Sequence, residues 1–207
     1  AANMVEGAVR DRGLSGLQFL TSQLHLYGKN PDWSSDGFTL FWDRFASLGV
    51  PVFFSLSINE PKREPLLDHY LLELQRLTTW MEQYPETPVV MTHGFLWTLF
   101  ADKDGFQLPD ELWRPFENPN LSLQILLPIG LGDKFDYPLP QAQPLLRDLV
   151  RNIGADRLMW GTDMPIVMRH WTYQQNIDFI VKYCDFLSKQ ELALIMGDNT
   201  KQLLGLS

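Results

Sequence analysis

The sequence has little cysteine: Cys184 is the single one among 207 residues. One thiol cannot form an internal disulfide, and no cluster of thiolates is available to bind zinc. Cys184 lies in the apolar segment I-V-K-Y-C-D-F-L. We therefore expect a buried, unreactive thiol rather than a nucleophile.

Positive charge and long apolar runs are also lacking. The chain has 17 Lys and Arg against 25 Asp and Glu, a formal net charge of -8. Nucleic acids and anionic membrane surfaces attract clustered Lys and Arg, so we expect neither as a partner. No run of eighteen apolar residues and no signal peptide is visible, so we expect no transmembrane helix and a cytoplasmic location.

Several familiar motifs are missing as well. Neither G-x-x-x-x-G-K-[ST] nor G-x-G-x-x-G follows a predicted strand, so nucleotide binding has no support. The G-x-S-x-G motif of serine hydrolases and the H-E-x-x-H motif of zinc peptidases are also absent. Any chemistry must therefore come from other polar residues.

What the chain does contain is a regular alternation of strand and helix patterns. Apolar residues make up 45% of the sequence, enough for one globular domain over residues 1–207. Five short apolar segments predict buried strands whose starts lie 33 to 38 residues apart. They begin at Gly16, Val50, Pro88, Leu121 and Arg157. Amphipathic helical patterns follow the second, fourth and fifth, over residues 65–81, 141–150 and 171–187.

This period predicts parallel strands joined by βαβ crossovers, in an α/β fold whose strands we read as apolar on both faces. Two architectures fit: an open doubly wound sheet and a TIM-type (β/α)8 barrel. A full barrel has eight strands and about 250 residues. If the chain is a barrel, it therefore holds only the last five βα units.

Polar residues at the predicted carboxyl ends of the strands are the candidates for chemistry, because ligands bind there in parallel α/β folds. His93 and Asp163 form the strongest pair. His93 is interpreted as a general acid or base or a metal ligand, or as a histidine held by structural hydrogen bonds. Asp163 either accepts a proton or binds a cation, or only caps the turn before Pro165.

Several other residues are weaker candidates for the site. Arg169 and His170 follow Asp163 and either bind an anionic group of a substrate or begin a solvated helix. His25 is a candidate for the mouth of the site, whereas His69 lies on a predicted helix and is interpreted as a packing or surface residue. Other polar residues near the strand ends are Gln18, Thr21, Ser22, Ser55, Ser57, Asn59, Glu60, Thr92, Asp133, Asp136 and Thr162.

Several motifs together resemble the amidohydrolase-related family of (β/α)8 barrels, which includes 2-pyrone-4,6-dicarboxylate lactonase and aminocarboxymuconate-semialdehyde decarboxylase. The similarity runs from about Leu14 to Leu206. Its motifs are G-V-P-V-F-F-S, P-V-V-M-T-H-G, D-Y-P-L-P, G-A-D-R-L-M-W-G-T-D-M-P and I-M-G-D-N-T-K-Q-L-L-G-L.

The resemblance implies roles for individual residues. Asp163 corresponds to the family's strand-eight aspartate, which binds metal or accepts a proton from water, and His93 to the strand-six histidine, which polarises or protonates the substrate. Ser55 stands where some members have a strand-five histidine, which favours a sub-group that works without metal or binds it weakly. No H-x-H metal pair occurs in the sequence.

We thus expect the carboxyl-terminal part of an enzyme that hydrolyses a C–O or C–N bond of a small carboxylated substrate, or decarboxylates it. Asp163 and His93 are the predicted catalytic residues. The predicted substrate-binding residues are Arg169, His170, Ser55 and Tyr137.

The resemblance implies one divalent metal, Zn²⁺, in a full-length protein, with Asp163 as a ligand once missing amino-terminal ligands are supplied. We expect no tight metal binding by this chain alone. We expect an oligomer or a partner to cover the open barrel edges. The alternatives are a non-catalytic remnant of the barrel and an unrelated open sheet in which His93 and Asp163 do not meet.

Overall fold

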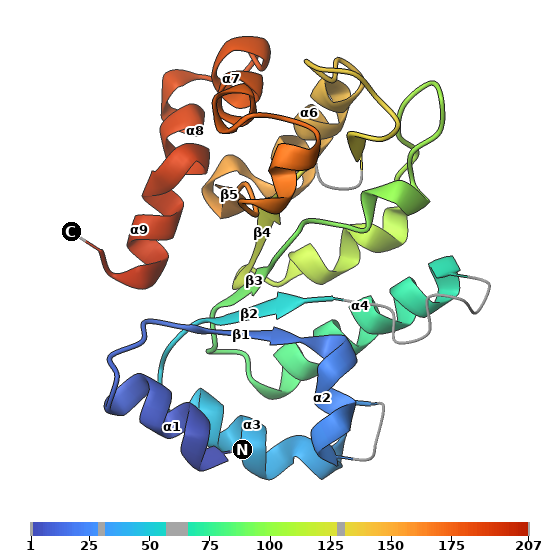
Figure 1. Cartoon of the computed structure of the whole chain (residues 1–207). Helices are drawn as coiled ribbons and strands as arrows, with labels where there is room; N and C mark the ends of the chain where they lie inside the picture. The colour runs from blue at the N-terminus through green and yellow to red at the C-terminus, as the bar shows by residue number, and fades with distance from the viewer. Residues whose placement is uncertain (1, 29–31, 57–65, 128–130, 207) are drawn as a thin grey trace.

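A computed structural model describes residues 2–28, 32–56, 66–127 and 131–206, with side chains from 25 to 28 left aside. Its centre is a sheet of five parallel strands in the order β1-β2-β3-β4-β5 (Figure 1). The strands are β1 (Leu17–Leu20), β2 (Val52–Ser55), β3 (Val89–Met91), β4 (Leu121–Ile125) and β5 (Leu158–Trp160).

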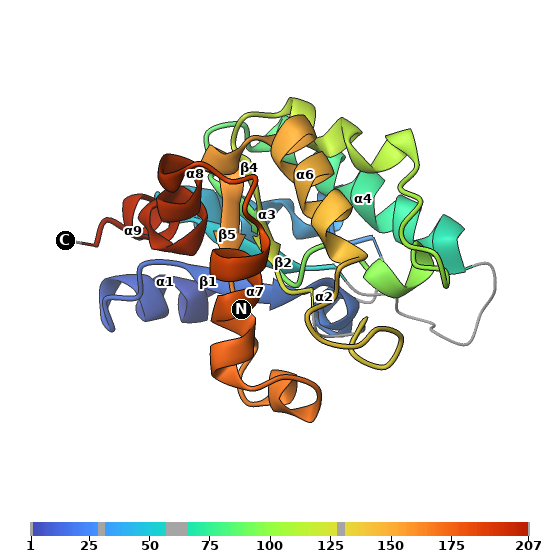
Figure 2. The same ribbon diagram turned by 90° about the horizontal axis from the view of Figure 1, so that it is seen from above.

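Helices connect and flank the strands, as the view from above shows (Figure 2). Within the described residues, none of them has both the length and the apolarity needed to cross a membrane. The helices are α1 (Ala2–Arg10), α2 (Thr21–Gly28), α3 (Thr39–Ala46), α4 (Leu66–Gln83), α6 (Ala142–Ile153), α7 (Tyr173–Tyr183), α8 (Lys189–Ala193) and α9 (Asn199–Leu204).

All five predicted strands are confirmed, and the strand order decides the architecture. A doubly wound sheet reverses its strand order at a switch point, whereas here each new strand adds to the same side of the previous one. The fold is a partial parallel (β/α) barrel, and the open doubly wound alternative was wrong. Within the described residues, β1 and β5 each pair with one strand only.

The two faces of the sheet differ, which corrects the expectation of strands apolar on both faces. One face is buried among helix side chains, and its residues include Val52, Phe54, Met91 and Leu123. The other face carries polar side chains that stay partly or fully exposed. They are Gln18, Ser55, Ser122 and Gln124.

The helix starts and ends have local causes. Thr172 before α7 and Ser188 before α8 each form a capping box, with Gln175 and Glu191 three residues later. Helix α6 stops at Gly154, whose φ of 98° favours glycine.

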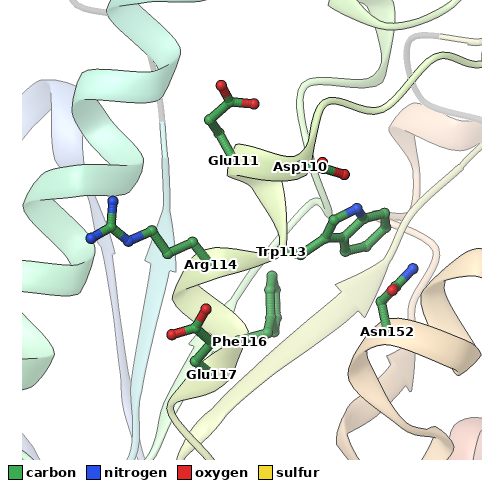
Figure 3. A pocket seen from close by; sticks show the side chains of 7 residues that line it. All are labelled: Asp110, Glu111, Trp113, Arg114, Phe116, Glu117 and Asn152. Atoms are coloured by element: carbon green, nitrogen blue, oxygen red, sulfur yellow. The ribbon is translucent and has the colours of Figure 1, made fainter.

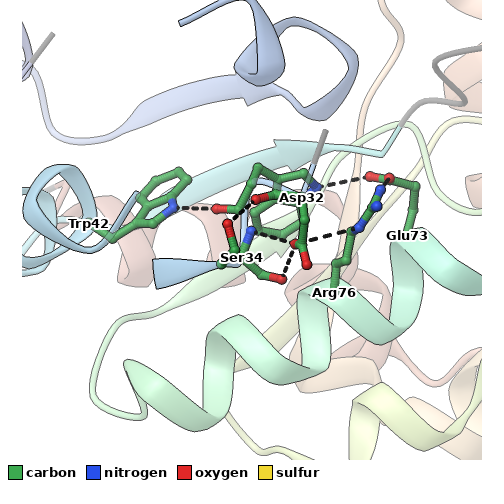
Figure 4. A network of polar contacts seen from close by, with 7 residues as sticks. Asp32, Ser34, Trp42, Glu73 and Arg76 are labelled. Atoms are coloured by element: carbon green, nitrogen blue, oxygen red, sulfur yellow. Dashed lines mark hydrogen bonds and ion pairs between the residues drawn. The ribbon is translucent and has the colours of Figure 1, made fainter. Parts of the chain in front are cut away.

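A polar network attaches the segment after α2 to helix α4 (Figure 4). The buried Glu73 carboxylate accepts a hydrogen bond from the Trp33 indole N–H at 2.9 Å and pairs with Arg76. Arg76 also lies 3.5 Å from Asp32, and Trp42 donates to the Trp33 carbonyl at 2.8 Å. Because a buried carboxylate is costly without partners, this network has a structural role.

One side chain, Asn199, gives the carboxyl-terminal motif I-M-G-D-N-T-K a structural role. Asn199, at the start of α9, is 5% exposed and donates from Nδ2 to the carbonyls of Ala155 and Leu158, both at 2.8 Å. These bonds attach α9 to the beginning of β5. The motif I-M-G-D-N-T-K therefore helps to position the strand that ends at Asp163.

Candidate functional site

His93 follows β3 and turns its ring toward the end of β2. Its Nδ1 lies 3.0 Å from Ser55 Oγ and 3.1 Å from Thr92 Oγ1. The backbone φ of His93 is 65° and that of Gly94 is 69°. A Cβ on Gly94 would come within 2.4 Å of the Trp97 ring, so the close approach behind His93 requires glycine.

Asp163 follows β5 and completes the pair across the sheet. One carboxylate oxygen, Oδ2, lies 4.0 Å from His93 Nε2. Two residues before Asp163, a Cβ on Gly161 would lie 2.7 Å from Gln124 Nε2 on the neighbouring strand, so the Gln124 side chain would have to move. The His93 and Asp163 side chains are 40% and 31% exposed, so a small molecule can reach both.

Both residues have a backbone conformation that is rare for side chains other than glycine. In the described part of the chain, His93, Asp163 and Leu139 are the non-glycine residues with positive φ. Such a conformation costs on the order of 1–3 kcal/mol and clusters at functional sites. Two of these three residues face each other across the strand ends, which favours a functional reading over a turn cap.

Ser55, the third residue at the strand ends, was predicted to bind substrate, and the structure places its hydroxyl on His93 Nδ1. Thr92 has the same contact. Sequence reasoning noted Thr92 at a strand end but gave it no role. The local signal was its position directly before the candidate histidine.

The remaining candidates lie farther along the chain. Arg169 ends a 3₁₀ turn, Ile166–Arg169, and its side chain is exposed. His170 packs over the backbone of Gly132, with Nδ1 3.7 Å from an oxygen of Asp133. Within the described residues, neither side chain forms a hydrogen bond or ion pair with His93 or Asp163.

Tyr137 lies in the connection between β4 and α6 and packs against two other rings. Its ring makes edge contacts with Trp171 and Tyr183, at centroid distances of 5.2 and 5.7 Å. Burial, followed by the neighbouring Tyr183 hydroxyl, raises the pKa of Tyr137 to about 12. These are packing contacts, and among the described residues none of them joins Tyr137 to His93.

The structure shows the surroundings of His69 and Cys184, whereas four other candidates lie outside the described residues. His69 lies half-buried on α4, as expected of a packing or surface residue. Cys184 is 3% exposed, and burial raises the pKa of its thiol to about 12, which confirms the buried thiol. Ser57, Asn59, Glu60 and the side chain of His25 lie outside the described residues.

The donors present do not complete a metal site. His93 Nε2 and Asp163 Oδ2 are two ligand atoms, and a protein metal site usually provides three or four. Among the described residues, no group of three His, Cys, Asp or Glu side chains is placed to hold a metal ion. The serine hydroxyl at position 55 is a poor metal ligand and is already paired with His93.

The surface has other hollows, and one is shown in Figure 3. It is an open depression of about 610 Å³ between the 3₁₀ turns Asp110–Leu112 and Arg114–Glu117 and the end of α6. Three carboxylates and one arginine line it, and none of its lining residues lies at a strand end. It offers no convergent polar groups comparable to the pair at the strand ends.

The fold defines the chain as a partial parallel (β/α) barrel, with His93 and Asp163 together at its strand ends. Residues 5–206 match the model of the family described as amidohydrolase. The chain therefore belongs to the amidohydrolase family, whose members are enzymes, and the resemblance seen in the sequence is confirmed. No curated protein sequence matches the chain significantly.

Solved structures share the fold at low sequence identity. An amidohydrolase from Burkholderia multivorans has a TM-score of 0.73 at 14% identity, over 100% of this chain and 71% of that one; another crystal form of it holds zinc. A probable 2-pyrone-4,6-dicarboxylic acid hydrolase from Acinetobacter baumannii, with citric acid bound, has a TM-score of 0.65 at 20% identity, over 100% of this chain and 69% of that one.

A decarboxylase shares the fold as well. Dihydroxybenzoic acid decarboxylase from Polaromonas, with manganese and the inhibitor 2-nitroresorcinol, has a TM-score of 0.64 at 15% identity, over 99% of this chain and 65% of that one. The chain thus spans about two thirds of the length of these structures.

Proposed function

We propose that this chain carries the proton-transfer part of an amidohydrolase active site that hydrolyses a C–O or C–N bond in a small carboxylated substrate. The observation that carries the proposal is the pairing of His93 Nε2 with Asp163 Oδ2 at 4.0 Å, on two strand ends. A separation above 3.5 Å between two polar atoms suits a bridging water.

The chemistry starts from that water. Its oxygen attacks the carbonyl carbon and forms a C–O bond, while the carbonyl π pair moves to oxygen and one water proton passes to the pair. The tetrahedral intermediate then expels the alkoxide or amine, which takes the proton back. General acid–base assistance of this kind contributes about 10²- to 10⁴-fold in rate.

Several supporting groups stay predictions. Arg169 is exposed six positions after Asp163 and free to hold a substrate carboxylate, with His170 next to it.

Residues 1–207 would form one domain, the carboxyl-terminal part of a barrel. A divalent ion such as zinc belongs to a longer polypeptide that adds ligands, and an oligomer or partner would cover the open edges of β1 and β5.

Decarboxylation is the second candidate, because a decarboxylase is among the structures that share the fold. In that reaction protonated His93 would deliver its proton to the ring carbon that loses carbon dioxide. The same pair would serve, with the proton moving to substrate instead of away from water.

The test uses two substrates and matched variants of a polypeptide that contains this chain. Ring opening of 2-pyrone-4,6-dicarboxylate and release of carbon dioxide from 2,6-dihydroxybenzoate separate the two reactions. Asp163→Asn should lower kcat by about 10²-fold or more without unfolding the protein. Asp104→Asn, at an exposed loop carboxylate, is the control.

The results decide among the readings. An Asp163→Asn variant that keeps more than a tenth of the activity would refute the assignment. A folded wild-type protein that turns over neither substrate would favour the non-catalytic alternative.

A further inference from the structure

The proton of the Thr92 hydroxyl is already committed to the backbone. Thr92 Oγ1 lies 3.2 Å from the carbonyl oxygen of Phe54, to which it donates, and the Thr92 N–H donates to the same oxygen at 2.8 Å. Thr92 is 5% exposed, so water does not compete for the hydroxyl. Toward His93 the hydroxyl therefore presents a lone pair only.

This commitment decides which nitrogen of the His93 ring carries hydrogen. Thr92 Oγ1 lies 3.1 Å from Nδ1. With the Thr92 hydrogen on the Phe54 carbonyl, a bare Nδ1 would face a lone pair at hydrogen-bond distance, which is repulsive, whereas an Nδ1 that bears hydrogen donates to that lone pair. Ser55 Oγ, 3.0 Å from the same nitrogen, is able to donate or accept and so does not decide the question alone.

We propose that Thr92 holds neutral His93 in the tautomer with hydrogen on Nδ1, so that Nε2 is a bare acceptor facing Asp163. Thr92 is thus a positioning residue that acts through His93. At many histidine sites, the hydrogen bond made by one ring nitrogen decides in this way whether the second nitrogen bears hydrogen.

The consequence for the site rests on the function proposed above. With Nε2 bare, the ring and the carboxylate are both acceptors, 4.0 Å apart. A water between them donates one hydrogen to each, which leaves its lone pairs free for the substrate carbon. In the neutral state His93 then takes a proton from the water rather than polarising the substrate.

The tautomer is measurable without any substrate. Long-range proton–nitrogen NMR spectra of protein labelled with ¹⁵N-histidine distinguish a pyrrole-like nitrogen, which bears hydrogen, from a pyridine-like one. His93→Asn assigns the signals among the four histidines. At a pH where the ring is neutral, we expect a pyrrole-like Nδ1 and a pyridine-like Nε2.

Three variants separate the effect of the Thr92 hydroxyl on the His93 tautomer from that of the Ser55 hydroxyl. Thr92→Val keeps the shape but removes the acceptor, so Ser55 becomes free to donate to Nδ1 and the hydrogen moves at least partly to Nε2. Thr92→Ser should restore the wild-type pattern, and Ser55→Ala should keep it. In an active polypeptide, Thr92→Val should lower kcat by about 10-fold with little change in KM.

Two results would overturn the inference: hydrogen on Nε2 in the wild type, or an unchanged pattern in Thr92→Val. If Thr92→Val does not fold, the wild-type spectrum and Ser55→Ala still decide. The expected tautomer in a protein without turnover would support this inference while rejecting the proposed function, so the two fail separately.

Discussion

Replacing Asn199 tests whether two buried hydrogen bonds attach the carboxyl-terminal helix to the sheet. Asn199→Ala removes both donors at once, and they serve the carbonyls of Ala155 and Leu158 at 2.8 Å each. A net hydrogen bond contributes about 1 kcal/mol, and a buried carbonyl left without a partner costs about 1–3 kcal/mol. We therefore expect a loss of about 2–4 kcal/mol in the free energy of unfolding.

The assay is urea unfolding followed by circular dichroism, with a thermal scan as a second measure. For a chain of this length, about 3 kcal/mol corresponds to a fall in Tm of roughly 6–12 °C. The matched control is Asn152→Ala, because Asn152 also donates to a carbonyl at 2.8 Å but lies exposed on α6. It should change stability by less than about 0.5 kcal/mol. Equal losses in the two variants would contradict the argument.

Three further predictions concern buried polar groups. Because burial raises the pKa of Cys184 to about 12, Ellman's reagent at pH 8 should label the native thiol at least ~10-fold more slowly than the unfolded one; prompt native labelling would be a contradiction. Burial raises the pKa of Tyr70 above 10, so its contribution to stability is complete below about pH 10 and is lost above it. Urea midpoints from pH 9 to 11 should fall less steeply for Tyr70→Phe, and parallel curves would argue against this. Glu73→Gln removes the charge beside Arg76 and should cost about 1–3 kcal/mol, whereas exposed Glu82→Gln should cost little; similar midpoints would refute the network's role.

The strands and their parallel arrangement were predictable because the chain repeats at a nearly constant interval. The strand order was not, since both candidate architectures have the same local pattern. The polar side chains on the second face of the sheet were hard to recognise, because strands of three to five residues place only one or two residues each on that face. That is too few to reveal an alternation. The helical pattern missed α1, α2, α3, α8 and α9, which lie outside the three segments read as amphipathic.

The candidate site was predictable only in part. His93 and Asp163 follow strands, and parallel strands bring their ends to one edge. The role of Thr92 was hidden, because alternation along a strand places consecutive side chains on opposite faces. The positive φ of His93 breaks that alternation and returns its ring to the Thr92 hydroxyl. The packing of Tyr137 against Trp171 and Tyr183 was not predictable, because a short motif gives no side-chain direction.

The left-handed backbone at His93 and Asp163 lowers folding stability at the same two positions that carry the proposed catalytic side chains. Glycine adopts these φ values freely, so exchanging either residue for glycine would relieve local strain of about 1 kcal/mol. A barrel remnant released from catalysis would gain from both exchanges. This chain keeps an imidazole and a carboxylate at two positions where any side chain beyond glycine lowers its own folding stability.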